Sequence, residues 1–334
     1  MPHADSEPTR RRFVAGAAAA ATAFGGALTS ANAQTAPLRV NIFGGLDAWP
    51  MYVLRERGFL KAAGFDLTLI TTTGSVPQFQ QMMNGGADLA STAMDNVVAY
   101  DVGQGDPAVT GDLDFFAFLG VGPGSLKLVV RPEITSFDQL RGKAFAVDAP
   151  ATGFSFVLRR MLEKKGIKPD EYSFVSLGST QKRFDGMVAG QCVGGVIGSP
   201  YDIIGAQKYG FHVLGSAIDV LGHYQAGVMM ARRSYAATHG PVLSAFVRGY
   251  RDATAWMYAP ANRAEALAIL TRNADLPPEI VAQVGPATLA AGGFSRDGAF
   301  DVAGVNTVME LRAAYATPKK AIADPKTFID LKYL

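Results

Sequence analysis

The sequence has little of what builds metal or redox sites: one cysteine, Cys192, and four histidines in 334 residues. A single cysteine excludes an intramolecular disulfide and a zinc site made of cysteines. The histidines, at positions 3, 212, 223 and 239, lack the spacing of a motif such as HExxH. We therefore expect neither a metal nor a cofactor.

Charge of one sign is also scarce. Lysine and arginine number 31 against 29 acidic residues, and charged residues make up only 18% of the chain. Nucleic-acid binding requires clustered basic residues, which no block of this sequence supplies. Because 49% of the residues are hydrophobic, disorder is excluded, and the length suits one large or two medium domains.

Long apolar runs are absent after residue 33, where no stretch approaches the ~20 residues that span a bilayer. Residues 9–14 (TRRRFV) precede an uncharged stretch rich in alanine and glycine, which ends in Ala31-Asn32-Ala33, a small-x-small cleavage pattern. This start resembles a twin-arginine (Tat) export signal. A poor membrane anchor or a basic tail is the alternative. We expect residues 1–33 to be a signal peptide, cleaved after Ala33, and the mature protein to be periplasmic.

Strands and helices alternate through the mature chain. Residues 39–43 and 66–70 read as strands, and residues 49–57 and 76–84, which follow them, read as helices. Such alternation predicts an α/β fold in which helices cover both faces of a sheet.

The same unit returns 104 residues further along the chain. Thr73-Gly74-Ser75 corresponds to Leu177-Gly178-Ser179, and each triplet follows a predicted strand and precedes a predicted helix. The shared order of elements predicts two lobes of like construction.

Two strong strands, residues 125–131 and 224–231, mark the places where the chain crosses between these lobes. We predict lobe 1 at residues 34–130 plus 225–334, lobe 2 at residues 131–224, and a hinge made of the two crossing strands. From residue 234 onward the pattern is nearly all helical, which predicts a helical C-terminal extension.

Several short motifs carry a family resemblance. They are Arg57-Gly58-Phe59, Gly64-Phe65, Gly74-Ser75 with Gln78, Gly86-x-Asp88, residues 94–100 (MDNVVAY), residues 136–143 (SFDQLRGK), and Asp324-Pro325 with residues 328–334 (FIDLKYL). Together they resemble the nitrate/sulfonate/taurine and thiamine-pyrimidine-precursor group of ABC-transporter substrate-binding proteins. The resemblance implies the periplasmic-binding-protein type II fold, capture of a small molecule between two lobes, and delivery to an inner-membrane ABC permease.

Ligands of open α/β sheets bind beyond the carboxyl ends of the strands, where helix N-termini point. Residues at such places that offer backbone N–H groups, hydroxyls, charges or rings are the candidate ligand-binding set: Gly45, Asp47, Trp49, Thr73, Gly74, Ser75, Asp95, Asn96, Thr152, Gly153, Ser155, Gly178, Ser179, Arg183, Ser199, Tyr201 and Tyr224. Glycines permit close approach, hydroxyls with unpaired N–H groups suit an oxygen-rich head, and aromatic rings can stack on a flat ligand.

Some of these residues have structural alternatives. Ser75, Asp95 and Ser179 can serve as helix caps, Trp49 can pack in the core, and Arg183 can be a surface charge.

Catalysis is not expected, because Asp47 and Asp95 have no histidine or lysine partner placed with them. A pyrimidine synthase of the same fold carries a cysteine-rich motif that this chain lacks. We therefore expect a monomeric periplasmic solute-binding protein for a small organic ligand, anionic or aromatic/heterocyclic. The alternatives are a ligand-sensing protein that serves a receptor and a synthase-like enzyme.

Overall fold

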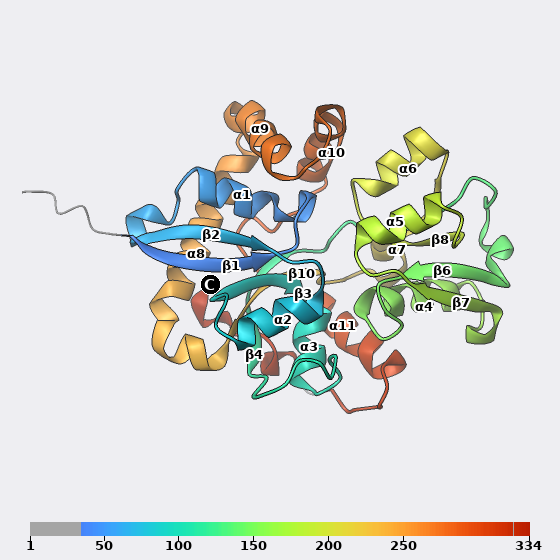
Figure 1. The fold of residues 1–334 in the computed structure, drawn as a ribbon, viewed down its shortest axis with the longest axis horizontal. Helices are drawn as coiled ribbons and strands as arrows, with labels where there is room; N and C mark the ends of the chain where they lie inside the picture. Colours follow the sequence, from blue (N-terminus) through green and yellow to red (C-terminus); the bar gives the residue numbers. More distant parts are fainter. Residues whose placement is uncertain (1–34, 323) are drawn as a thin grey trace, which may run out of the picture. The chain divides into compact units, whose positions relative to one another are not determined.

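The computed structural model describes residues 35–322 and 324–334, so the signal predicted at residues 1–33 lies outside the described residues. Residues 35–334 form one compact unit. Within its described part, the strands form two five-stranded sheets with helices packed around them (Figure 1).

The first sheet has the order β2-β1-β3-β10-β4. Its strands are β1 (Ala36–Ile42), β2 (Phe65–Thr71), β3 (Leu89–Ala93), β4 (Phe115–Gly122) and β10 (Gly227–Arg232). Strands β1, β2 and β3 are parallel, whereas β10 runs antiparallel to both β3 and β4. The helices that follow β1, β2 and β3 are α1 (Trp49–Glu56), α2 (Ser75–Met83) and α3 (Met94–Asp101). We call the part built on this sheet lobe 1.

The second sheet has the order β7-β6-β8-β5-β9. Its strands are β5 (Lys127–Val130), β6 (Lys143–Val147), β7 (Tyr172–Ser176), β8 (Gly194–Ile197) and β9 (His212–Ser216). Its helices are α4 (Gly153–Lys164), α5 (Thr180–Val188), α6 (Tyr201–Tyr209) and α7 (Ala217–Leu221). Strands β6, β7 and β8 are parallel, and β5 is antiparallel to β8 and β9. We call the part built on this sheet lobe 2.

The two sheets have the same plan. In each, a central strand (β1 or β6) lies between two parallel neighbours, and a fourth strand that comes from a distant part of the chain runs antiparallel beside them. The nine-residue helices α2 and α5 occupy equivalent places, which accords with the repeated unit predicted from the sequence. Met94, Asp95 and Asn96, which follow β3, form the first turn of α3.

The remaining helices are C-terminal and belong to lobe 1: α8 (Arg233–Tyr258), α9 (Arg263–Asn273), α10 (Pro278–Ala290) and α11 (Val302–Tyr315). Helix α8 is the longest of the four, with 26 residues. Its early turns are separated from the rest by a kink at His239, two residues before Pro241, and proline interrupts helical hydrogen bonding in this way.

Strand β4, which was not predicted from the sequence, is buried along its whole length. Its free edge is covered by the C-terminal segment: the Ala117 N–H donates to the Phe328 carbonyl at 2.8 Å, and the Asp330 N–H donates to the Ala117 carbonyl at 2.9 Å. Covering an edge in this way prevents it from pairing with another chain.

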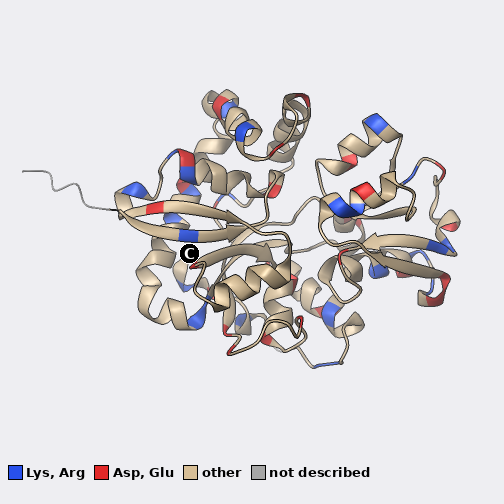
Figure 2. Cartoon of the chain, in the orientation of Figure 1, with Lys and Arg blue, Asp and Glu red and all other residues tan. Residues whose placement is uncertain are grey.

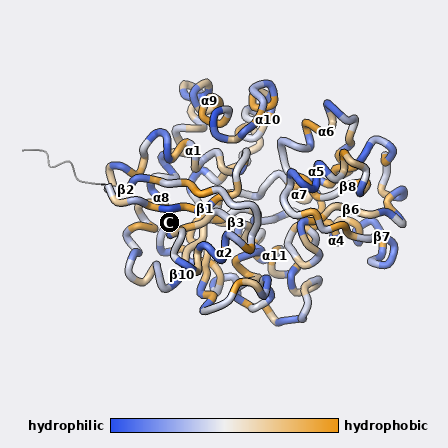
Figure 3. The backbone as a smooth tube through the Cα atoms, in the orientation of Figure 1, coloured by the Kyte–Doolittle hydropathy of each residue, from blue (hydrophilic) through white to orange (hydrophobic). Residues whose placement is uncertain are grey.

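Apolar residues fill cores in both lobes, and Figure 3 shows hydrophobic stretches in strands and helices of each. One buried cluster is continuous between the lobes, since it includes Val97 and Val98 of α3 as well as Phe156 and Leu158 of α4. Basic and acidic residues are interspersed over both lobes (Figure 2). Among the described residues, no helix has the length and hydrophobicity needed to cross a membrane.

Candidate ligand-binding site

Two chain crossings join the lobes at the carboxyl ends of their parallel strands. Register pairs Gly227 of β10 with Ala93, the last residue of β3, and with Gly122, the last residue of β4. In lobe 2, Lys127 of β5 pairs with Ile197 and Ser216, the last residues of β8 and β9. We call the side of a sheet where its parallel strands end the carboxyl edge. Both crossings therefore connect the carboxyl edge of one sheet to the carboxyl edge of the other.

The first crossing comprises only residues 123–126, between β4 and β5. A connection of this length spans at most about 17 Å, so the two carboxyl edges must lie close to each other there. The second crossing, residues 222–226, returns the chain from α7 to β10. Side chains beyond the parallel strands of the two lobes are thereby brought to one place.

The lobes also touch on either side of these crossings. Helix α11 of lobe 1 packs against α4 of lobe 2, and α10 packs against α6. Gln207 Nε2 of α6 donates to Gln283 Oε1 of α10 at 2.5 Å. A Cβ added to Gly153, at the start of α4, would lie 2.7 Å from the Cβ of Asp95. Gly153 thus permits the first turns of α3 and α4 to meet, and a larger residue would hold them apart.

Asp95 is 2% exposed and forms a buried two-pronged ion pair with Arg312 of α11. Arg312 Nε donates to Asp95 Oδ1 at 2.7 Å, and Nη2 donates to Oδ2 at 2.5 Å. The same guanidinium lies over the ring of Phe156 in lobe 2, 5.2 Å from its centroid. Because both partners are buried and matched, Asp95 joins the elements at the lobe boundary and does not act as a helix cap.

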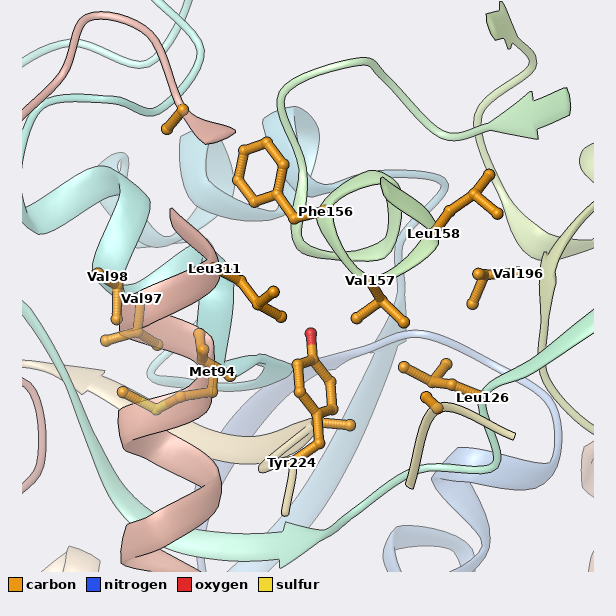
Figure 4. Packing of buried hydrophobic residues seen from close by; sticks show 14 of the residues in the cluster. Met94, Val97, Val98, Leu126, Phe156, Val157, Leu158, Val196, Tyr224 and Leu311 are labelled. Atoms are coloured by element: carbon orange, nitrogen blue, oxygen red, sulfur yellow. The ribbon is translucent and has the colours of Figure 1, made fainter. Parts of the chain in front are cut away.

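Tyr224 stands in the second crossing and is 2% exposed. Figure 4 shows its hydroxyl pointing between Leu311 of α11 and Val157 of α4. Burial and the nearby Asp95 and Asp148 carboxylates raise the pKa of this hydroxyl.

Asp47 lies just beyond β1, in the short 3₁₀ turn Leu46–Ala48. Leu46 and Ala48 are buried, whereas the Asp47 side chain is exposed. The surrounding protein nevertheless excludes enough water to raise the pKa of its carboxyl to about 6. No cation lowers that pKa, so Asp47 is a carboxyl without charge compensation at the carboxyl edge of lobe 1.

Arg183 of α5 is the matching polar group in lobe 2. It is 2% exposed, which excludes the surface-charge alternative. Its Nη1 donates to the Gly178 carbonyl at 2.9 Å and its Nη2 donates to Thr180 Oγ1 at 3.0 Å, while Nε has no partner among the described residues. Burial lowers its pKa, and the Asp148 carboxylate counters that effect.

Asp148 follows β6 directly and was not in the predicted set. The Thr152 hydroxyl donates to Asp148 Oδ1 at 2.6 Å. Burial raises the pKa of Asp148, and the positive charge of Arg183 partly offsets this rise. Its position at the end of a predicted strand was a signal that sequence reasoning could have used. Arg312 gave no such signal, because only folding brings α11 to Asp95.

We call Asp47, Asp95, Asp148, Arg183 and Tyr224 the interlobe site. Four of its members were predicted from the sequence, and ligand contact stays a prediction for them.

The predicted glycines and hydroxyls have varied roles. Gly45 and Gly178 both have a φ of 85°, a left-handed conformation that favours glycine. Ser179 caps α5, because its hydroxyl accepts a hydrogen bond from the Lys182 N–H at 3.4 Å. Ser75 does not cap α2: Gly74 occupies the N-cap position, and Ser75 is the first helical residue.

Other predicted hydroxyls and amides are engaged within the protein. Asn96 Nδ2 donates to Thr92 Oγ1 at 3.0 Å, and Ser155 Oγ donates to the Pro150 carbonyl at 2.8 Å. Ser199 Oγ lies 3.0 Å from Ser125 Oγ, across the first crossing. Thr73 lies in the turn after β2, and no hydrogen bond of its side chain is found among the described residues.

Two predicted aromatic residues are packed inside the protein. Trp49 is fully buried, and its indole N–H donates to the Ala266 carbonyl at 2.8 Å, as the core alternative expects. Tyr201 begins α6 and packs beside Phe184, with 5.3 Å between ring centroids. Stacking on a ligand therefore stays a prediction for Tyr201, and the structure gives Trp49 a packing role.

No cluster of three metal-ligating side chains occurs in the part of the chain that the structure describes. A cavity of about 270 Å³ is lined by residues of α2 and the loop after α3, among them Met83 and Val109. It lies away from the crossings and holds none of the interlobe site, so it does not bear on the predicted ligand.

Solved structures share this architecture. The ligand-binding component of an ABC-type import system from Staphylococcus aureus, with zinc bound, matches with a TM-score of 0.72 and 13% identity, over 89% of this chain and 97% of that one. The periplasmic aliphatic sulphonate binding protein SsuA from Escherichia coli matches with a TM-score of 0.65 and 17% identity, over 88% and 92%. The fold is therefore that of the periplasmic binding proteins, as the sequence predicted.

The family follows from sequence matches. A family model described as NMT1/THI5 like matches residues 46–264, which is more than half of the chain. YtlA of Bacillus subtilis (strain 168), whose name describes it as a binding protein, is 31% identical over 99 residues; the match spans 29% of this chain and 28% of YtlA. The chain belongs to the NMT1/THI5 like family, and the predicted resemblance is confirmed.

Proposed function

We propose that this protein captures a small organic ligand between its two lobes and delivers it to an ABC importer. The observation that carries the proposal is that short crossings join the carboxyl edges of the two sheets, with the buried Tyr224 in the second crossing. The import-system component and SsuA, which share the fold, are named as binding proteins, and this likeness supports binding over catalysis.

Ligand capture would proceed by closure of the lobes about residues 123–126 and 222–226. A ligand favours the closed arrangement only if it binds that arrangement more tightly than the open one. The contacts of α4 with α11 and of α6 with α10, which this structure already contains, would hold the closed arrangement together. The closed protein would then be the form that the permease recognises.

Solution scattering and thermal melting test this mechanism together. A panel of sulfonates, aromatic carboxylates, pyrimidines and nitrate should contain compounds that raise the melting temperature. Such a compound should also reduce the radius of gyration of the monomer. A compound that stabilises the protein without compaction would contradict closure, and conversion of a bound compound to a product would contradict a binding-only role.

The periplasmic location is part of the proposal. Relatives of the same fold are periplasmic, and residues 9–14 resemble a twin-arginine signal. Replacing Arg10 and Arg11 with lysine should leave the precursor in the cytoplasm, as fractionation and immunoblotting can show. Replacing Arg12 alone with lysine is a control, because it leaves that pair intact. Unchanged export of the double variant would refute the Tat assignment.

A further inference from the structure

The first crossing between the lobes is held by lobe 2. Ser125 Oγ lies 3.0 Å from Ser199 Oγ, in the loop that leads from β8 to α6. Lys127, the first residue of β5, pairs with the buried Asp202 of α6 at 2.5 Å. The chain from residue 125 onward is therefore fixed to lobe 2, and residues 123–124 before it are left to bend.

The second crossing is held by lobe 1. Gln225 is 2% exposed, and its Oε1 accepts a hydrogen bond from the N–H of Asp301, at the start of α11, at 2.9 Å. Gly304 of α11 permits this approach, because an added Cβ would lie 2.5 Å from the backbone nitrogen of Gln225. The chain from Gln225 onward is therefore fixed to lobe 1. The exposed Gly222 before it, with a φ of 76°, is left to bend.

On the side of α4 and α11, the contact between the lobes is a packed core. Phe156 and Leu158 of α4 are fully buried, Leu311 of α11 is 2% exposed, and all three belong to one cluster (Figure 4). At the end of α11, the Tyr315 hydroxyl accepts a hydrogen bond from Arg160 Nε of α4 at 3.0 Å. Separating α4 from α11 would expose these apolar side chains to water, so this contact is costly to break.

On the side of α6 and α10, the contact between the lobes is shallower. Gln207 and Gln283, whose side chains join the two helices, are both exposed. Ile203 and Ile204 of α6 pack against the core of lobe 1 but are only half-buried. An exposed hydrogen bond exchanges readily for bonds with water, and half-buried side chains lose less on separation. This contact is therefore the easier of the two to break.

We propose that the lobes open on one side only: α6 separates from α10, while α4 and α11 stay packed as a pivot. The chain bends at residues 123–124 and at Gly222. This inference rests on the proposed function, because it concerns how the lobes open and close. A small molecule enters between α6 and α10, and the contact of Gln207 with Gln283 forms again when the lobes close around it.

Two chemical tethers test this inference without a ligand. A flexible bismaleimide links Gln207→Cys to Gln283→Cys, across α6 and α10. The matched tether links Glu163→Cys to Tyr315→Cys across α4 and α11, where the Tyr315 hydroxyl donates to Glu163 Oε2. Both pairs are made in the mature protein with Cys192→Ala, so that the introduced thiols are the only ones. Solution scattering compares each tethered monomer with the same variant capped by N-ethylmaleimide.

We expect the tether across α6 and α10 to reduce the radius of gyration, and the tether across α4 and α11 to leave it unchanged. Compaction by the α4–α11 tether alone, or by both tethers equally, would overturn the inference and leave closure of the lobes intact. Compaction by neither tether would contradict closure itself. Where thermal melting shows that Tyr315→Cys does not fold, Ala314→Cys, at an exposed neighbour on α11, takes its place.

Discussion

At the scale of single residues, the interlobe site combines groups that are costly to bury. Asp47, Asp148 and Arg183 each have a pKa moved in the direction that burial favours, toward the neutral form. Perturbed ionisable groups gather at functional sites because ligand binding needs groups that water and neighbours have not already satisfied. These residues therefore lower the stability of the ligand-free protein, and their polar groups remain available to a ligand.

Asp47 gives a pH-dependent prediction. Its folded-state pKa of about 6 lies above the ordinary value of 3.8, so ionising it opposes folding. The effect is absent below about pH 4, grows between pH 4 and 6, and is constant at higher pH. Asp47→Asn should therefore stabilise the ligand-free protein by roughly 1 kcal/mol at pH 8, a value reduced for solvent screening of an exposed group.

Chemical denaturation of the wild type and Asp47→Asn should show that this stabilisation vanishes at pH 4. Asp66→Asn, which removes an exposed acid of β2, is the control variant at both pH values. A stabilisation by Asp47→Asn that is equal at pH 4 and pH 8 would show that the carboxyl charge is not its cause.

The ion pair of Asp95 and Arg312 gives a second prediction at this scale. Arg312→Met leaves the Asp95 carboxylate buried without a partner and should cost about 3–5 kcal/mol in the free energy of unfolding. Arg272→Met removes an exposed arginine that pairs with Glu56 and Glu265, and should cost about 1 kcal/mol or less. Urea denaturation measures both, and equal costs would contradict the role assigned to burial.

At the scale of elements, the C-terminal segment completes lobe 1 by covering the edge of β4. Phe328 is fully buried there, whereas Leu331, three residues later, is 52% exposed. The contrast follows from the pairing with β4, which fixes which side chains of the segment enter the core.

Phe328→Ala should therefore destabilise the protein by about 3–5 kcal/mol, since it opens a cavity in a packed core. Leu331→Ala should change stability by no more than about 0.5 kcal/mol. Thermal denaturation of both variants checks this, together with light scattering for association through the uncovered β4 edge. Similar melting temperatures for the two variants would mean that the segment does not hold the edge.

At the scale of the whole molecule, Gly153 controls how closely the lobes approach. A Cβ at this position would meet the Asp95 side chain at 2.7 Å, closer than non-bonded carbons approach. Gly153→Ala should weaken ligand binding several-fold by opposing the closed arrangement, while it leaves each lobe folded.

Gly215→Ala in β9 is the matched control, because its added Cβ would make an ordinary contact with Met161 at 3.5 Å. Scattering should show that the Gly153→Ala monomer stays more extended with a bound ligand than the wild type does. Full compaction of Gly153→Ala would show that the contact between α3 and α4 does not limit closure.

Local pattern was enough to predict the class of fold. Alternating apolar strands, glycine turns and the returning Gly-Ser unit predict α/β lobes, because strand and helix periodicity and turn chemistry act over a few residues. The same signals placed Asp47, Asp95, Arg183 and Tyr224 near the carboxyl edges. The division at residues 130 and 224 stays a prediction, since residues 35–334 form one compact unit.

Only the tertiary structure decided which of these side chains remain available to a ligand. Asp95 is paired with Arg312, 217 residues away, and Trp49 is packed in the core beside Ala266. By contrast, Arg183 Nε is buried without a partner among the described residues. Whether a polar side chain is satisfied depends on contacts between distant segments, which no local pattern contains. The sequence determines the residue types and the ends of the strands. The fold determines which of these polar side chains are paired within the protein.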